Sequence, residues 1–339
     1  MTDDALQQAV SIIRSGRTFG VVSHVDPDGD AAGSIIAAML MLRSLGKEVR
    51  SLQNDAMPEM YSFLPGYALA AKTDAASKQL SRGELDCVIV FDSSTLSRVA
   101  WDYGDTAVPA KRVINIDHHK DNALFGHVNI VDGEASSASE LFFGIVDAFG
   151  LSNDVQIATN LFTGISTDTG SFSFSNTTPA ALRVAARLLE TGVDVAEITR
   201  HLECNFTLQR LVFFGKVLAS AKSTEDGSIV WIVGTEQMRR EAAFWGSTEQ
   251  FTNYVMKVRA AEIAVFFSQS AADQYKVSIR SRGRIDASGL AALFGGGGHE
   301  RAAGCIVNGS LDSVISDVIG AARNELKQAA SSRRRVLLD

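Results

Sequence analysis

Three short apolar runs in the first half of the chain each end in a cluster of acidic or histidine side chains. The runs are residues 19–23 (FGVVS), 87–91 (CVIVF) and 113–116 (VINI). Near-continuous apolar strands of this kind, separated by helix-like segments, are typical of a parallel sheet whose two faces are both covered. The sequence therefore predicts an α/β fold with a parallel sheet and helices on both faces.

Helix-like stretches of the first half, which separate or follow these strands, are residues 31–45, 137–149, 155–165 and 179–191.

The rest of the chain predicts a second, smaller α/β domain. The second half adds strand-like runs at 229–233, 263–267 and 275–280, and helices at 287–293 and 311–329. We predict the following divisions: a first domain over 1–192, a helical linker over 193–223, a second domain over 224–330 and a tail over 331–339.

Composition limits the classes of function. A chain of 339 residues is long enough for two domains, and a net charge of −7 argues against a protein that coats long nucleic acid. The longest apolar run, residues 35–42, is too short to span a bilayer, and the acidic N-terminus has no apolar signal-peptide core. Three cysteines without a C-x-x-C pair suggest a reducing compartment. We therefore expect a cytoplasmic protein with no membrane partner.

Polar side chains follow each of the three predicted strands. The first strand is followed by His24, Asp28 and Asp30, the second by Asp92, and the third by Asp117, His118 and His119. A fourth cluster, around Asp168, follows a helix-like segment. Ligands of open α/β sheets bind at the carboxyl ends of the strands, so we expect these clusters to converge on one edge.

The chemistry of these side chains points to metal binding. Asp and His without Cys favour a divalent ion such as Mn²⁺, with Mg²⁺ or Co²⁺ as options and Zn²⁺ less favoured. Each feature alone has a simpler interpretation, since an Asp-Gly-Asp segment is usually a turn and Asp92 can cap a helix. The combination favours a metal site.

Five motifs then carry a resemblance to a known family. The segments SHVDPDGDAAGS, VIVFDSS, INIDHHKDN and GISTDTGSFSFSNTT resemble, in this order, the four motifs of the DHH phosphoesterase superfamily. The segment FGGGGHERAAG resembles the signature of the DHHA1 domain that accompanies one branch of it. The chain is similar to the NrnA-like enzymes of that branch, which act on very short RNA and on 3'-phosphoadenosine 5'-phosphate. The resemblance implies a DHH catalytic domain and a DHHA1 substrate-binding domain.

The resemblance also implies roles for individual residues. The family pattern assigns one ion to His24, Asp28 and Asp92, and a second ion to Asp30, Asp92, His118 and Asp168, so that Asp92 bridges both. It implies that His119 contacts the phosphate, and Asp117 resembles a residue that orients a histidine. The implied reaction is attack of a hydroxide, held between two divalent ions, on phosphorus. Neither the residues nor the resemblance identifies the general acid.

The glycine run before His299 has two interpretations, a flexible linker or a grip for an anion. Its flanks are apolar and it lies inside the predicted second domain, which favours the grip. The resemblance implies substrate binding by a set of second-domain residues: Arg280, Ser281, Gly296, Gly297, Gly298 and His299. The substrates implied are short RNA or DNA, linear dinucleotides such as pApA and pGpG, and 3'-phosphonucleotides.

Other interpretations of the function stay open at this point. One is a pyrophosphatase or exopolyphosphatase of the same superfamily, another is a cyclic-dinucleotide phosphodiesterase, and a third is a nucleotide-binding module without catalysis. The sequence ranks neither the substrates nor the metals, and it leaves the cleavage direction and the oligomeric state undecided, with a homodimer as one option.

Overall fold

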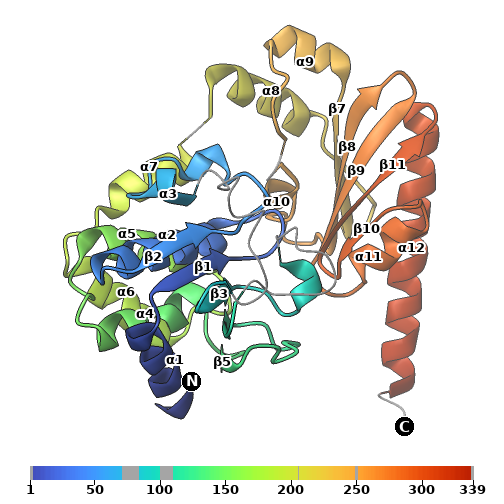
Figure 1. Cartoon of the computed structure of the whole chain (residues 1–339). Helices are drawn as coiled ribbons and strands as arrows, with labels where there is room; N and C mark the ends of the chain where they lie inside the picture. The colour runs from blue at the N-terminus through green and yellow to red at the C-terminus, as the bar shows by residue number, and fades with distance from the viewer. Residues whose placement is uncertain (1–2, 71–83, 100–109, 205, 249–250, 337–339) are drawn as a thin grey trace. The chain divides into compact units, whose positions relative to one another are not determined.

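The computed structural model describes residues 3–70, 84–99, 110–204, 206–248 and 251–336. The chain forms two compact units, Met1–Asn205 and Phe206–Asp339 (Figure 1). The division falls between helices α7 (Val195–Glu203) and α8 (Leu208–Ala219). This point lies inside the segment expected to be a linker, so the domain boundaries drawn from the sequence stay a prediction.

A five-stranded sheet forms the centre of the first unit. Its order is β2-β1-β3-β4-β5, and every neighbouring pair is parallel. The strands are β1 (Thr18–Val22), β2 (Glu48–Ser51), β3 (Cys87–Phe91), β4 (Val113–Asp117) and β5 (Val128–Val131). The predicted α/β class and parallel sheet are confirmed, and β2 and β5 are additional to the three strands expected.

The helices of the first unit are α1 (Asp3–Ser15), α2 (Gly29–Ser44), α3 (Tyr67–Ala70), α4 (Ala138–Ala148), α5 (Val155–Asp168), α6 (Pro179–Leu189) and α7, with 3₁₀ turns η1 (Glu59–Tyr61) and η3 (Leu96–Arg98). The positions of α2, α4, α5 and α6 agree with the sequence pattern to within a few residues, whereas α1 and α3 are additional to the helices expected. Thr178 caps α6 and Pro179 begins it. The expected helix 193–223 is broken into α7 and α8.

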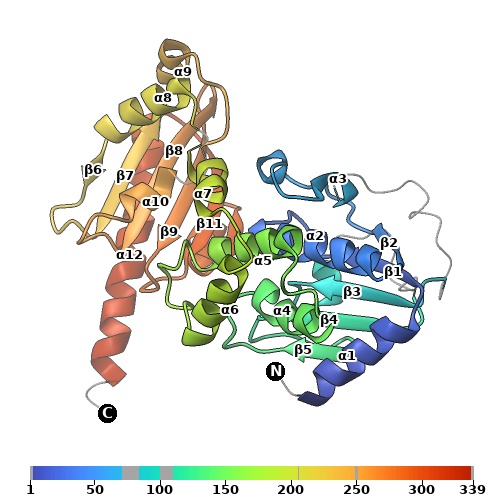
Figure 2. The ribbon, with the colours of Figure 1, turned by 90° about the vertical axis from the view of Figure 1, so that its left-hand side faces the viewer.

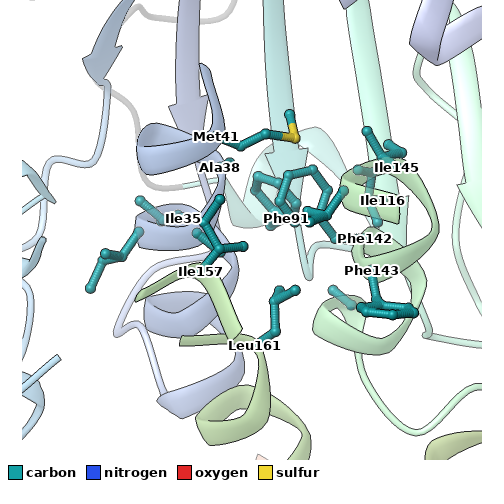
Figure 3. Packing of buried hydrophobic residues seen from close by; sticks show 14 of the residues in the cluster. Ile35, Ala38, Met41, Phe91, Ile116, Phe142, Phe143, Ile145, Ile157 and Leu161 are labelled. Atoms are coloured by element: carbon teal, nitrogen blue, oxygen red, sulfur yellow. The ribbon is translucent and has the colours of Figure 1, made fainter. Parts of the chain in front are cut away.

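The two faces of this sheet are covered differently. One face packs against α2, α4 and α5, where Phe91 of β3 meets Phe142 of α4 edge to face at 5.0 Å (Figures 2 and 3). The opposite face carries a smaller apolar cluster that includes Val22, Val90 and Val99, the last directly after η3. Apolar side chains are therefore buried on both faces, which is why the strands read as continuous apolar runs.

Helices α2 and α5 lie in close contact because small residues face each other between them. A Cβ atom added at Gly33 of α2 would collide with the backbone oxygen of Asn160, and one added at Gly29 of α2 would collide with the Thr167 side chain of α5. This contact brings the N-terminal end of α2, with Asp28 and Asp30, near the C-terminal end of α5, where Asp168 lies.

The second unit is built on a six-stranded sheet of order β10-β11-β9-β8-β7-β6. Only the β7–β8 pair is parallel among the pairs that the structure describes. The strands are β6 (Lys222–Ser223), β7 (Ile229–Gly234), β8 (Ile263–Ala271), β9 (Gln274–Ser281), β10 (Gly297–His299) and β11 (Ala302–Asn308). The helices are α8, α9 (Glu236–Ala242), α10 (Phe251–Val255), α11 (Ala287–Ala292) and α12 (Leu311–Val336).

This second sheet has one fully covered face. Helices α11 and α12 pack on that face against apolar side chains of β8, β9 and β11, and Figure 1 shows α12 running along the sheet. On the other face, an aromatic cluster from α8, α10 and β8 covers the β7–β8 half. Helix α12 continues to Val336, so the segment expected to be a frayed tail from Ser331 is helical up to that residue.

The glycine run is part of the second sheet. Gly297 to His299 form β10, which pairs antiparallel with β11. A Cβ atom at Gly296 would collide with the Gly304 oxygen, and one at Gly298, where φ is 148°, would lie 2.6 Å from the Ala302 oxygen. The glycines thus allow the hairpin to close, and the run does not connect the two units.

Within the described residues, no helix has the length and apolar character needed to cross a membrane.

The close contact of α2 with α5 predicts a stability effect. Gly33→Ala should destabilise the chain by about 1–3 kcal/mol, since the new methyl group must displace the backbone of α5. Urea denaturation followed by circular dichroism measures this. Gly320→Ala in α12 is the matched control, because its Cβ meets nothing within 4 Å and should be neutral or stabilising. Equal midpoints for the two variants would contradict the prediction.

Candidate metal centre

Asp92 lies at the carboxyl end of β3 in a left-handed backbone conformation, with φ of 50°. Its N–H group donates to the Ile116 carbonyl of β4 at 2.9 Å, which fixes the residue to the neighbouring strand. A left-handed conformation costs free energy for any residue other than glycine, and such strain is concentrated at functional sites. The strand end therefore holds the Asp92 carboxylate in one defined place.

The two oxygens of Asp92 lie near different histidines. Oδ2 is 3.3 Å from Nε2 of His24, and Oδ1 is 3.3 Å from Nε2 of His118. The side chain is 4% exposed, and Oδ1 has no hydrogen-bond partner among the described residues. A buried carboxylate oxygen without a donor is costly, so this atom is suited to a cation.

The first potential ligand group consists of His24, Asp28 and Asp92. Nδ1 of His24 lies 2.7 Å from the Val25 carbonyl, so it carries the proton and Nε2 is left as the ligand atom. This Nε2 atom is 3.8 Å from Oδ1 of Asp28. Asp28 also caps α2 by accepting from the N–H groups of Asp30 and Ala31. Helix capping therefore accounts for the position of Asp28 and leaves its carboxylate at the cluster.

The second potential ligand group consists of Asp30, His118 and Asp168. Nε2 of His118 is 3.5 Å from Oδ2 of Asp168, and that oxygen is buried without a hydrogen-bond partner among the described residues. Asp92 and His118 also form a third group with His119. Two sets of oxygen and nitrogen ligands thus lie side by side, with Asp92 between them.

Asp30 is fixed by the start of α4. Its carboxylate accepts from the backbone N–H groups of Ala138 at 2.6 Å and Ser139 at 2.9 Å. The N-terminal N–H groups of a helix stabilise a negative charge, but burial and the nearby carboxylates of Asp92 and Asp168 outweigh them and raise the pKa of Asp30 to about 8. The first residues of α4 therefore position Asp30 as well as starting the helix.

His119 is oriented by Asp117 of β4. Nδ1 of His119 lies 2.7 Å from Oδ1 of Asp117, which is fully buried. The second oxygen of Asp117 accepts from Asn122, whose amide group also donates to Asn115. This network fixes the ring and leaves Nε2 of His119 as the atom that can contact a ligand.

The acidic cluster holds protons on its histidines when no cation is present. Burial lowers the pKa of His24, but Asp28 and Asp92 outweigh it and raise this pKa to about 10. The pKa of His118 is likewise raised to about 10, because Asp92, Asp30 and Asp168 outweigh burial. Burial and neighbouring carboxylates raise the pKa of Asp168 to about 6. These protons partly neutralise carboxylates that would otherwise repel one another, a task that divalent cations perform more completely.

The chemistry of the cluster therefore fits divalent cations. Two buried carboxylate oxygens lack hydrogen-bond donors among the described residues, and the two oxygens of Asp92 face imidazole nitrogens of different ligand groups. Carboxylate and imidazole without thiolate suit Mn²⁺, Mg²⁺ or Co²⁺. Each of the six ligands expected from the sequence lies in one of these groups.

Of the substrate residues expected in the second unit, the structure places His299 and Arg280 together but gives Ser281 a different role. His299 pairs with Ala302, and Ala302 pairs with Arg280, so His299 and Arg280 lie on the same face of the sheet. Ser281 points elsewhere, because its buried hydroxyl group donates to the Ile285 carbonyl and accepts from the Gly283 N–H group. Ser281 therefore stabilises the turn after β9.

Two positioning residues escaped the sequence interpretation. Gln53, which follows β2, donates to the backbone carbonyl of His24 and accepts from the N–H group of Ser23. Asn122 lies in the third motif, but no role follows from its neighbours in the sequence. The position of Asn122 at the end of that motif is the sequence feature that could have indicated its role. Gln53 lies in a segment without any motif, so the sequence contains no comparable indication for it.

Comparisons with known proteins agree with this geometry. A model of the DHH family, N-terminal domain, matches residues 18–165, and a model of the DHHA1 domain matches residues 228–332. The bifunctional oligoribonuclease and PAP phosphatase NrnA of Thermus thermophilus is 36% identical over 91% of this chain and 90% of its own length.

The chain belongs to the DHH family.

Further relatives agree with this membership. The enzyme of the same name from Bacillus subtilis is 27% identical over 87% of this chain and 91% of its own. A crystal structure of an exopolyphosphatase-related protein from Bacteroides fragilis, 27% identical, superposes with a TM-score of 0.84 over 96% of both chains. The DHH family resemblance expected from the motifs is confirmed, and this chain is a phosphoesterase of that family.

The shared position of Asp92 predicts the loss of both ions together. Asp92→Asn should weaken Mn²⁺ binding at both sites by more than roughly 100-fold, since changes outside the ligand shell alone cost roughly 10–100-fold. Calorimetric titration of the metal-free chain measures this. Asp26→Asn is the matched control, because Asp26 also has a left-handed backbone, at φ of 55°, and lies in none of the ligand groups. Loss of only one binding event would contradict the bridging position.

The raised histidine pKa values predict a pH dependence of metal binding. His24 and His118 are protonated at neutral pH without metal, and ligation requires their neutral forms, so each binding event must release protons. Metal affinity should therefore rise as the pH increases from 6 toward 10. Titrations in two buffers of different ionisation enthalpy count the released protons, and an observed heat that is independent of the buffer would contradict this expectation.

Proposed function

We propose that this chain hydrolyses short oligonucleotides and 3'-phosphonucleotides such as PAP, using two divalent cations held by the first unit. The observation that carries the proposal is the Asp92 carboxylate, whose two oxygens face His24 and His118, members of two different ligand groups. The names of the relatives from Thermus thermophilus and Bacillus subtilis support the choice of substrates.

The proposed ligands are His24, Asp28 and Asp92 for one ion and Asp30, Asp92, His118 and Asp168 for the other. When bound, such cations act as Lewis acids toward a phosphoryl oxygen and lower the pKa of water. Four carboxylates offset the charge of two divalent ions, so the site can accept an anionic substrate. Mn²⁺ is the proposed ion, because it suits mixed Asp and His ligands.

His119 is proposed to donate a hydrogen bond from Nε2 to a phosphoryl oxygen. Asp117 holds Nδ1 and, with its charge, raises the pKa of His119 despite the opposing effect of burial. The imidazole therefore keeps its second proton to a higher pH than an isolated histidine does. Donors fixed in advance toward developing negative charge contribute strongly to the rate of phosphoryl transfer.

The second unit is proposed to bind the nucleotide part of the substrate through Arg280, His299 and the backbone of Gly296 to Gly298. Arg280 is half-buried, and burial lowers the pKa of its guanidinium group. A bound anion would supply the negative charge that this buried cation needs. Gly297 and Gly304 are partners across the β10–β11 hairpin and Gly304 pairs with Ser278, so the two strands place no side chain in this row of the sheet. A phosphate can therefore approach the backbone there.

A second candidate is hydrolysis of polyphosphate, favoured by the name of the Bacteroides fragilis structure. Polyphosphate contains no nucleoside, so the two candidates differ in whether the second unit must recognise a base. Three free cysteines, two of them buried, agree with a reducing compartment, and we propose the cytoplasm. A homodimer stays a prediction.

The decisive assay compares substrates with one metal at a time. With Mn²⁺, we expect hydrolysis of pApA, pGpG, PAP and short RNA, a fall in rate with increasing RNA length, and no release of phosphate from polyphosphate. His119→Ala should lower kcat by roughly 100-fold or more. Lys120→Ala is the matched control, because Lys120 is exposed and pairs only with Glu134 among the described residues. Turnover of polyphosphate but not of nucleotides would favour the second candidate.

A further inference from the structure

The second unit contains a cavity of ≈ 780 Å³ on the partly covered face of its sheet. Helices α11 and α12 cover the other face with their apolar sides, and the aromatic cluster of α8 and α10 ends at β8. Beyond β8, Lys276, Ser278 and Arg280 of β9 and Gly304 of β11 line the cavity on this face. Ile306 of β11 lies on the same face and is exposed, so this part of the sheet is accessible and largely polar.

Positive charge dominates this cavity. Arg239 of α9 lines it together with Lys276 and Arg280, and Glu236 is the one acidic residue among the lining residues. Glu236 lies 3.4 Å from Arg240, which offsets its charge. In the part of the chain that the structure describes, none of the three cavity cations forms an ion pair. A concave cluster of unpaired cations in a chain of net charge −7 is a site for an anion.

Arg239 is held in a fixed orientation. Its guanidinium group lies 4.8 Å from the centre of the Phe213 ring and donates to the Gly246 carbonyl at 3.3 Å and to the Ser268 hydroxyl group at 3.1 Å. Burial lowers its pKa, so the protonated form lacks the stabilisation that an anion would give. An arginine positioned in advance loses little conformational entropy when it binds a phosphate.

Trp245 adds an aromatic surface to the same cavity. It is 63% exposed and directly precedes Gly246, whose carbonyl accepts from Arg239. A large exposed aromatic side chain beside cations is the combination that binds single-stranded nucleotides, since bases stack on the ring while cations hold the phosphates.

We propose that Arg239 and Trp245 form a nucleotide subsite, in which Trp245 stacks on a base and Arg239, with Lys276 and Arg280, holds the adjacent phosphate. This inference rests on the proposed function and extends it to residues outside the DHH and glycine motifs. The class of ligand is a nucleotide unit of a short oligonucleotide. Polyphosphate would satisfy the cations but leave Trp245 without a partner.

The first experiment measures equilibrium binding by the full-length chain in EDTA, so that no hydrolysis occurs. The probe is a dinucleotide with a 5' phosphate and a 3' fluorophore, followed by anisotropy. Arg239→Gln should weaken binding at least tenfold and lower the slope of log affinity against log salt by about 0.7, as expected for one contact to a single-strand phosphate. Arg259→Gln is the matched control, since Arg259 is an exposed arginine of the same unit that does not line the cavity. Equal binding by the two variants overturns the proposal.

The second experiment separates the base from the phosphate. Trp245→Ala should raise the KM for a dinucleotide by roughly 5- to 100-fold, the range for loss of one stacked base, and Trp245→Phe should restore most of it. Neither variant should change the KM for a dinucleotide that has one abasic ribose. An unchanged KM for Trp245→Ala in an active enzyme overturns the subsite while leaving the proposed function intact. Absence of hydrolysis by the unmodified chain overturns the proposed function, and the binding experiment then tests the subsite by itself.

Discussion

The structure depends on holding buried carboxylates of like charge close together. Asp30 and Asp92 are almost completely buried, Asp168 lies within reach of the same histidine, and each would repel the others when ionised. The chain lowers this repulsion with His24 and His118 and with the N–H groups at the start of α4. Two carboxylate oxygens still lack a donor, which is the physical reason for expecting cations at this place.

The fold of the first unit meets that constraint with rigid elements. Parallel strands β3 and β4 end at the same edge and deliver Asp92 and Asp117 to it. The close packing of α2 on α5 through Gly33 brings Asp30 to Asp168, from segments far apart in the sequence. Positioning residues such as Gln53 and Asn122 then fix the backbone or the rings of the histidines. Rigid support of this kind is what precise metal geometry requires.

The second unit solves a different problem, because it leaves part of one sheet face uncovered. The aromatic cluster stops at β8, and the next strand presents Lys276 and Arg280 in place of apolar side chains. Apolar and polar residues alternate along β9, whose sequence YKVSIR has an apolar residue at every second position. Only the structure shows that the polar side of this strand lines an open cavity, and that Arg239 and Trp245 of a distant segment line the same cavity.

The sequence by itself determined the α/β class, the cores of β1, β3 and β4 and of α2, α4, α5 and α6, and the candidate ligands, because apolar periodicity and motif spacing are local properties of the chain. It did not determine the break between α7 and α8, the helical extension to Val336, or the engagement of Ser281 in a turn, since contacts and chain geometry decide these. Tertiary structure alone decided that the two oxygens of Asp92 face different histidines and that α4 binds Asp30. The physical reason is that burial and charge act between residues that only the folded chain brings together.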